Sequence, residues 1–170
     1  MTLEIRALAA TDDRSAFRSG DEALDLFFHR YAGQNQFRHH IGVSYIAVEG
    51  ARILGFATVS TAALDAEALP TERGLPRYPV PILRVARLAV DADARGRGIG
   101  MALMRHSIEL AERLRDDVGC VGVVVDAKPD ALGFYERLGF QPIALVEGAV
   151  QQRPPAQPLF LALGAVPRRR

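Results

Sequence analysis

Residues 82–104, which decide the fold, read ILRVARLAVDADARGRGIGMALM. In the apolar run 82–90, Val85, Leu88 and Val90 fit a mostly buried strand. A polar turn follows at 91–94, then glycine-rich residues, and from residue 99 the apolar residues recur at helical spacing. The segment therefore predicts a strand, a glycine-rich turn and the start of a helix in direct succession.

Such a turn is suited to binding an anion. The first N–H groups of a helix have no partner within the helix, and the helix dipole places partial positive charge there. Glycines leave out the Cβ atoms that would keep a pyrophosphate away from the backbone. The turn is a candidate phosphate-binding loop, and the alternative is a strand-to-helix connection without a ligand.

Spacing excludes two common phosphate-binding motifs. A dinucleotide fingerprint, G-x-G-x-x-G, would need a glycine where Met101 stands. A P-loop needs Gly-Lys-Ser/Thr, and the only lysine of the chain is the distant Lys128. The residues instead match the pattern [Arg/Gln]-x-x-Gly-x-[Gly/Ala], with Arg95, Gly98 and Gly100.

Length and composition describe an ordinary folded protein. With 170 residues, 49% of them hydrophobic and 24% charged, a single domain over residues 1–170 is expected. The N-terminal residues do not resemble a signal peptide, and no apolar run approaches the ~20 residues of a membrane span, so we expect a cytoplasmic protein without membrane contact. One cysteine and four histidines offer no zinc-like spacing, so we expect no metal.

The order of the expected elements predicts an α/β layer fold with a mixed sheet. Residues 62–81 hold four prolines and are expected to form a loop with one helical turn. Helical segments are expected at 12–17, 19–31, 99–118 and 129–138. Residues 34–40 are expected to be a polar connection from the second of these helices to the next strand. Strands are expected at 3–7, 43–48, 53–61, 82–90, 120–125, 143–146 and 158–164.

Two further motifs accompany the glycine-rich turn: Leu88-Ala89-Val90-Asp91 before it, and FYERLGF at 134–140 after it. Together the three resemble the GNAT N-acetyltransferase superfamily. The resemblance implies a mixed, mostly antiparallel sheet of about six to seven strands flanked by about four helices, with acetyl-CoA as co-substrate. The cofactor-binding residues that it implies are Leu88, Ala89, Val90, Arg95, Gly96, Arg97, Gly98, Ile99, Gly100 and Phe134.

A narrower resemblance covers almost the whole chain. The run FRSGDEALDLF at 17–27 is similar to the opening of the GNAT-type toxins of bacterial toxin–antitoxin pairs, although Ser19 stands where cysteine is frequent. Segments 75–81 and 87–91 also look like that group. The resemblance implies acetylation of the α-amino group of aminoacyl-tRNA, a block of translation, a small ribbon-helix-helix antitoxin as partner, and a homodimer.

The residues are compatible with this chemistry. Forming an amide from a thioester needs a neutral amine, a stabilised oxyanion and an acid for the leaving thiolate. Many acetyltransferases place a glutamate base near the central strand, but residues 82–90 contain none. A free α-amine has a pKa of about 8, lowered further by esterification of its carboxyl, whereas a lysine amine near ~10.4 needs a base far more. The missing carboxylate therefore favours an aminoacyl ester over a lysine side chain.

Tyr135 is the candidate acid, because its phenol can protonate the coenzyme A thiolate. Packing is the alternative, since Tyr135 shares a helical apolar face with Phe134 and Leu138. By the geometry of the family, backbone N–H groups around Leu88 to Val90 would meet the oxyanion.

Basic side chains could line a groove for the phosphates of tRNA, and a solvated surface position is the alternative for each of them. Two other functions stay open: an acetyltransferase for a small amine, a peptide N-terminus or an antibiotic, which predicts an acidic pocket, and a non-catalytic acyl-CoA-binding module. The adjacent histidines lack a third ligand for a metal. The tRNA-binding candidates are Arg30, Arg38, Arg77, Arg84 and Arg87, with His39 and His40.

Overall fold

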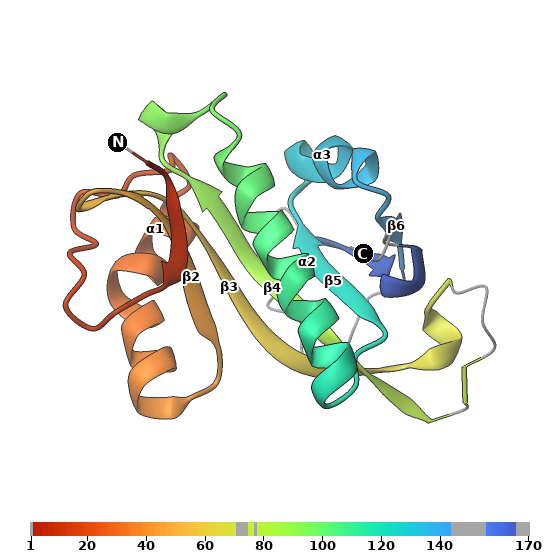
Figure 1. Cartoon of the computed structure of the whole chain (residues 1–170). Coiled ribbons are helices and arrows are strands. Elements are labelled where there is room, and N and C mark those ends of the chain that lie inside the picture. The colour runs from red at the N-terminus through yellow and green to blue at the C-terminus, as the bar shows by residue number, and fades with distance from the viewer. Residues whose placement is uncertain (1, 71–74, 77, 144–155, 166–170) are drawn as a thin grey trace. The chain divides into compact units, whose positions relative to one another are not determined.

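The computed structural model describes every residue except 1, 71–74, 77, 144–155 and 166–170 (Figure 1). The chain divides into two compact units, Met1–Ser60 with Val85–Glu109, and Thr61–Arg84 with Leu110–Arg170. Three long elements pass from one unit into the other: β3 (Arg52–Asp65), β4 (Pro79–Val90) and α2 (Ile99–Asp117). The glycine-rich loop belongs to the first unit and Tyr135 to the second.

In the described part of the chain, seven strands pair in the order β1-β2-β3-β4-β5-β7-β6. The pairs β1–β2, β2–β3, β5–β7 and β6–β7 are antiparallel. The predicted α/β fold with a mostly antiparallel sheet of six to seven strands is confirmed. The remaining strands are β1 (Glu4–Ala7), β2 (Val43–Glu49), β5 (Gly122–Ala127), β6 (Gln141–Pro142) and β7 (Gln157–Ala162).

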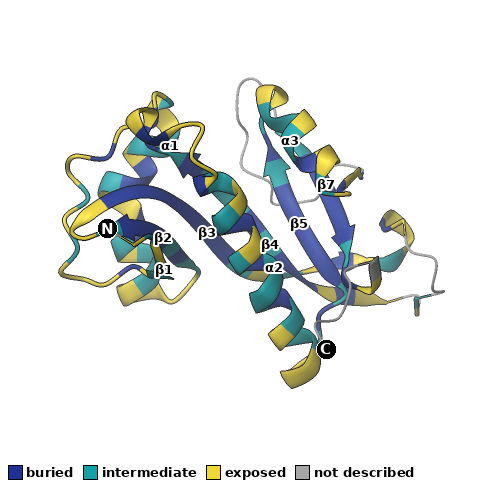
Figure 2. Cartoon of the chain, turned by 45° about the horizontal axis from the view of Figure 1, so that its top comes forward, coloured by how far each residue is buried: buried dark blue, intermediate teal, exposed yellow. Residues whose placement is uncertain are grey.

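Aromatic packing fixes the N-terminal segment onto β3 in the first unit. The rings of Phe28 and Phe56 stack with centroids 4.2 Å apart, and Phe17 meets both edge-on. β3 itself is buried from residue 53 to 59, which Figure 2 shows as a dark blue length of strand. Since aromatic pairs of this kind stabilise beyond their buried area, the three rings hold three distant parts of the sequence together.

Helix α1 (Glu22–Leu26) begins at Asp21, whose carboxylate accepts a hydrogen bond from the N–H of Leu24. The helix then continues through two π-helical segments, η1 (Phe27–Tyr31) and η2 (Gln34–His39). It ends at His40, which has the left-handed conformation φ 54°.

The polar connection expected at 34–40 is therefore wrong, because residues 34–39 are helical. Polar residues there do not all face solvent, because the amide of Gln36 donates to the carbonyl of Leu8 and accepts from the N–H of Ser44. This side chain joins the helical segment to β2 and to the residue that follows β1.

The second unit packs β5 and β7 around an apolar cluster that includes Val80, Ile82, Val124 and Phe160. Helix α3 (Leu132–Arg137) follows β5 after a 3₁₀ turn, η5 (Pro129–Ala131). Among the described ranges no helix is long and apolar enough to span a membrane.

The expected loop at 62–81 is shorter than predicted. β3 extends to Asp65 before the 3₁₀ turn η3 (Ala66–Ala68), and β4 begins at Pro79. Pro79 stands at the first residue of its strand, where a missing N–H is tolerated. The strand expected at 143–146 falls mostly outside the described residues.

Substitution of Gly122 tests the close contact between β5 and β7. A Cβ there would collide with the Phe160 ring and lie 2.5 Å from the carbonyl oxygen of Leu161, so we expect Gly122→Ala to lower the free energy of unfolding by about 3 kcal/mol. Gly164 has open space around its Cβ position, so Gly164→Ala should stay within about 0.5 kcal/mol of wild type. Urea denaturation measures both, and equal stability of the two variants would contradict the packing described.

Candidate active site

The glycine-rich loop joins β4 to α2 through a short 3₁₀ turn, η4 (Ala92–Ala94). Gly96 and Gly98 have φ of +79° and +77°, a region that glycine adopts without the strain of a side chain. A Cβ at either position would meet no heavy atom within 4 Å. The space beside the loop is therefore open, and a ligand can approach its backbone directly.

Helix α2 begins immediately after this loop, and its first hydrogen bond runs from Ala102 N–H to the carbonyl of Gly98, at 3.0 Å. Ile99 is buried and lies against Gly55 of β3, where a Cβ would come within 2.8 Å of the Ile99 side chain. The absence of that Cβ lets the first turn of α2 pack closely on the sheet. Ile99 can thus serve a ligand only through its backbone.

Leu88, Ala89 and Val90 lie at the end of β4, just before the loop. Ala89 is buried, whereas Leu88 and Val90 are partly exposed. Phe134 is also partly exposed, and it lies in the second unit on α3.

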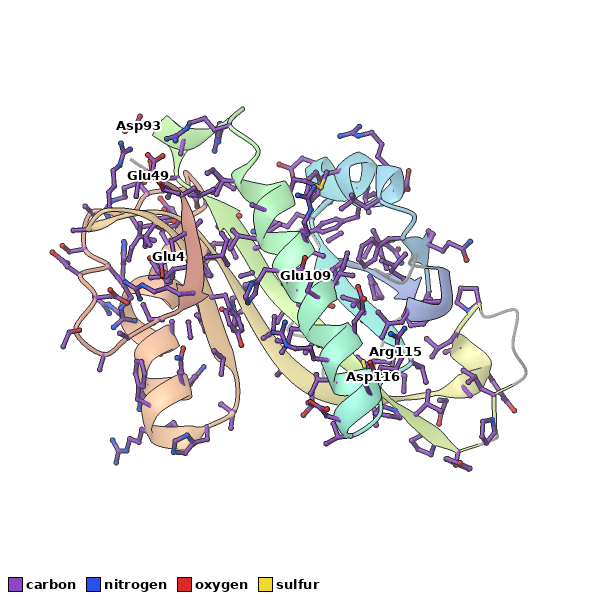
Figure 3. The ribbon with its side chains drawn as sticks, viewed as in Figure 1. Glu4, Glu49, Asp93, Glu109, Arg115 and Asp116 are labelled. Atoms are coloured by element: carbon purple, nitrogen blue, oxygen red, sulfur yellow. The ribbon has the colours of Figure 1, made fainter. Side chains whose placement is uncertain are left out.

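Both arginine side chains of the loop are engaged by other parts of the first unit. Arg97 donates to Glu49 at 2.5 Å, and this hydrogen bond raises the pKa of Arg97 and lowers the pKa of Glu49. Arg95 donates through Nη2 to the backbone carbonyl of Ser19. Glu49 and Asp93 lie at the same end of this unit (Figure 3). The phosphate-binding groups that the loop offers are therefore its backbone N–H groups and the start of α2.

Asp91 ends one of the motifs noted in the sequence, but no role in the site was expected for it. Its side chain is buried, and its two carboxylate oxygens accept from the N–H groups of Arg18 (3.1 Å) and Asp93 (3.0 Å). Arg52 lies 3.6 Å away. The available signal was an aspartate directly after an apolar strand and directly before a glycine-rich turn.

Tyr135 is buried in the second unit, 4% exposed, with its ring edge-on to those of Phe134 and Phe140. Burial, and to a lesser extent the charge of Asp126, raises the pKa of its phenol far above the ordinary value. The hydroxyl therefore keeps its proton at neutral pH. The ring contacts are those of a packed side chain, and the raised pKa makes the phenol a weaker acid although it stays protonated.

The arginines expected to contact tRNA occupy different environments. Arg84 is mostly buried, and its Nε and Nη2 donate to the carboxylate of Asp126 at 2.8 and 2.9 Å. The guanidinium carbon of Arg87 lies 3.8 Å from the centroid of the Phe27 ring, a cation–π contact. Arg77 lies outside the described residues. Arg30, Arg38, His39 and His40 are exposed on the helical segment 22–40.

Within the described residues, no three His, Cys, Asp or Glu side chains gather where they could hold a metal ion.

Comparison with known proteins identifies similar sequences and structures. The family described as Acetyltransferase (GNAT) domain matches residues 40–142. A Mycobacterium tuberculosis protein named tRNA-acetylating toxin is 30% identical over 141 residues, which cover 80% of this chain and 82% of that protein. The structure of AtaT complexed with acetyl-methionyl-tRNAfMet is similar with a TM-score of 0.84 and 27% identity over 97% of both chains. A Tyr-to-Phe mutant of AtaT, bound to the C-terminus of the antitoxin AtaR and to acetyl-CoA, gives a TM-score of 0.78 at 26% identity over 96% of this chain and 95% of that one.

Titration of the tyrosines tests the buried state of Tyr135. We expect native wild type and native Tyr135→Phe to show the same tyrosinate absorbance up to about pH 11, because burial raises the pKa of Tyr135. After unfolding in denaturant, wild type should show one tyrosinate more.

The same shift predicts a pH dependence of stability. Above about pH 10 the unfolded chain releases the Tyr135 proton while the native protein retains it, so the free energy of unfolding falls as the pH rises. In Tyr135→Phe the free energy of unfolding should therefore fall less between pH 10 and higher pH than it does in wild type. If native Tyr135→Phe showed one tyrosine fewer than native wild type titrating near pH 10, Tyr135 would not be buried as described.

Proposed function

Since the chain belongs to the GNAT acetyltransferase family and is an acetyl-CoA-dependent N-acetyltransferase, we propose that it is a toxin that acetylates the α-amino group of aminoacyl-tRNA and so blocks translation. The extent of the similarity carries this proposal. It reaches 80% of the chain in the tRNA-acetylating toxin and 97% in the complex of AtaT with acetyl-methionyl-tRNAfMet. A match limited to the acetyl-CoA loop would support only the reaction, and not the acceptor.

The loop fits the diphosphate of acetyl-CoA, which supplies the activated acetyl group. Open space beside Gly96 and Gly98 gives phosphate oxygens access to backbone N–H groups, and the N-terminus of α2 adds a favourable dipole. Arg95, Arg97 and Ile99 would contribute through their backbone, since their side chains are engaged elsewhere or buried, and Phe134 lies on α3. The proposed contacts remain Leu88, Ala89, Val90, Arg95, Gly96, Arg97, Gly98, Ile99, Gly100 and Phe134.

The α-amine of an aminoacyl ester can attack without a strong base, which agrees with the lack of any carboxylate in β4. A new N–C bond forms and the C–S bond breaks, while one amine proton must leave the nitrogen and one proton must reach the sulfur. Backbone N–H groups around Leu88 to Val90 would stabilise the oxyanion that forms between the two events.

Tyr135 is the proposed carrier of that proton. A phenol with a raised pKa is a weaker acid than a thiol, whose pKa is about 8.5, so protonation of the thiolate by Tyr135 alone would be uphill. The transfer becomes favourable if the acidic ammonium of the attacked intermediate replaces the phenol proton in the same step. In this role Tyr135 moves the proton from nitrogen to sulfur and ends unchanged.

The exposed face of the helical segment 22–40 is the proposed contact for tRNA. Residues 26–48 contain no aspartate or glutamate, and Arg30 and Arg38 lie exposed within them. Tyr31 and Phe37, 47% and 42% exposed, offer rings on which unpaired bases can stack. Arg87, Arg77 and Arg84 remain candidates, although Nε and Nη2 of Arg84 already donate to Asp126. A basic face of this kind favours RNA over a small cationic amine.

We further propose a cytoplasmic homodimer that is neutralised by a small ribbon-helix-helix antitoxin. The complex of AtaT, a protein similar to this one, with the antitoxin AtaR supports an antitoxin as partner, whereas the ribbon-helix-helix class and the homodimer rest on the sequence resemblance to GNAT-type toxins. A gene for a small ribbon-helix-helix protein directly upstream would favour the toxin over an acetyltransferase for small amines.

Inducible expression in bacteria tests the proposed activity. We expect wild type to arrest growth and to accumulate N-acetylated aminoacyl-tRNA, measured by mass spectrometry of the tRNA-linked amino acids. Tyr135→Phe should do neither, because it lacks the hydroxyl that moves the proton. Tyr78→Phe, at a tyrosine that is 63% exposed, is the matched control and should behave as wild type. Normal growth without adducts on wild-type expression would refute the toxin, and an active Tyr135→Phe would refute the proton-transfer role.

Binding of tRNA tests the basic helical face. We expect the double variant Arg30→Ala/Arg38→Ala to weaken tRNA binding about tenfold and to reduce the slope of log affinity against log salt by about 2, since two phosphate contacts are lost. Arg105→Ala/Arg113→Ala removes two exposed arginines from α2 and serves as the control of equal charge. Fluorescence anisotropy at several salt concentrations measures both slopes. If the two double variants lose equal slope, the contribution is only general charge and the proposed face is wrong.

A further inference from the structure

Residues 17–25, here called the Ser19 corner, hold the glycine-rich loop in place. We propose that Arg95 and Asp91 are positioning residues for acetyl-CoA that act through this corner, and that the side chain of Arg95 does not contact the phosphates. The inference rests on the acetyl-CoA site proposed above. It also assigns a structural role to the run FRSGDEALD, in which the toxin resemblance begins.

The first link joins Arg95 to the corner. Its Nη2 donates to the carbonyl oxygen of Ser19, across 76 residues of sequence. Gly20, the next residue, has φ of +92°, and a Cβ on it would lie 3.3 Å from that same Nη2. Glycine is thus favoured at position 20 both by its backbone conformation and by the close approach of the guanidinium.

The second link joins the corner to the start of the loop. The N–H of Arg18 donates to Asp91 Oδ2 at 3.1 Å, and the carbonyl of Arg18 accepts from the N–H of Ala92 at 2.8 Å. The other oxygen of Asp91 accepts from the N–H of Asp93. The first two bonds fix the backbone of residues 91 and 92 against the corner, and the third stabilises the turn itself.

The corner is itself firmly held. The N–H and hydroxyl of Ser19 donate to Asp25 Oδ1 at 3.0 and 2.6 Å, and the Ser19 hydroxyl accepts from the N–H of Asp21. Asp21 caps α1, and Phe17 is anchored in the aromatic core with 2% of its surface exposed. The path of contacts therefore runs from the core through the corner to the loop.

This arrangement matters because the loop contains two glycines at positive φ. Glycine has more conformations to lose than other residues, so an unbraced loop would scatter the directions of its N–H groups. Binding would then have to bear the entropic cost of ordering them. The contacts of the Ser19 corner fix the residues just before the two glycines, and this lowers the cost before the ligand arrives, without touching the ligand.

Calorimetric titration with coenzyme A tests the inference. We expect Arg95→Ala and Gly20→Ala each to weaken binding about tenfold, the loss expected for one hydrogen bond to a charged group. The double variant should be little weaker than either single variant, because both remove the same link. The loss should be similar at low and high salt. In steady-state kinetics the KM for acetyl-CoA should rise while kcat stays nearly constant.

The control for Arg95→Ala is Arg105→Ala, which removes an exposed arginine from α2, and the control for Gly20→Ala is Gly164→Ala. Thermal denaturation of the unliganded variants identifies any general loss of folding. Should Gly20→Ala fail to fold, Arg95→Ala and Asp91→Asn carry the test, with the same expected rise in Kd and KM.

Three results would overturn the inference in distinguishable ways. If wild type does not bind coenzyme A, the proposed site itself is wrong. If wild type and the variants bind coenzyme A equally well, the proposed site stands, but Arg95 and Asp91 do not position the loop for binding. If Arg95→Ala weakens binding only at low salt while Gly20→Ala has no effect, Arg95 contacts the phosphates directly.

Discussion

The glycine-rich loop depends on the hydrogen bonds that the buried carboxylate of Asp91 accepts. A buried charge is tolerated only when hydrogen bonds fill its oxygens, and here the N–H groups of Arg18 and Asp93 fill them. One side chain thereby joins the end of β4, the N-terminal segment and the first turn of the loop. Gly96 and Gly98 adopt positive φ in a loop whose first turn is fixed. The loop backbone is therefore accessible to a ligand and yet held in one conformation at its start.

The parts of the fold that could be predicted from the sequence are those with regular apolar spacing. Ile99 and Leu103 belong to the buried stripe of α2, and both were expected from their helical repeat. The helix beyond residue 31 could not be predicted, because Gln36 turns inward to serve the backbone of Leu8 and Ser44. A local pattern does not show which polar side chain will find such partners.

Some residues of the candidate site could likewise be located from the sequence, and others could not. The loop glycines and Tyr135 lie in short continuous motifs, so their positions could be located from sequence, and a packed Tyr135 was one of the two alternatives that its helical apolar face left open. The arginines could not be sorted, because their partners are distant in the chain. Arg84 of β4 and its partner Asp126 of β5 are 42 residues apart. Pairs of such separation are set by the order of strands and not by neighbouring residues.

Both compact units are discontinuous in sequence, which bears on how the chain is made. All residues of the first unit precede residue 110, whereas the second unit includes residues from 110 onward. Synthesis proceeds from the N-terminus, so the residues of the glycine-rich loop are made before Tyr135. A nascent chain would therefore hold the loop without the tyrosine. An enzyme that silences ribosomes in the proposed way would gain its full set of reacting groups only near the end of its own translation.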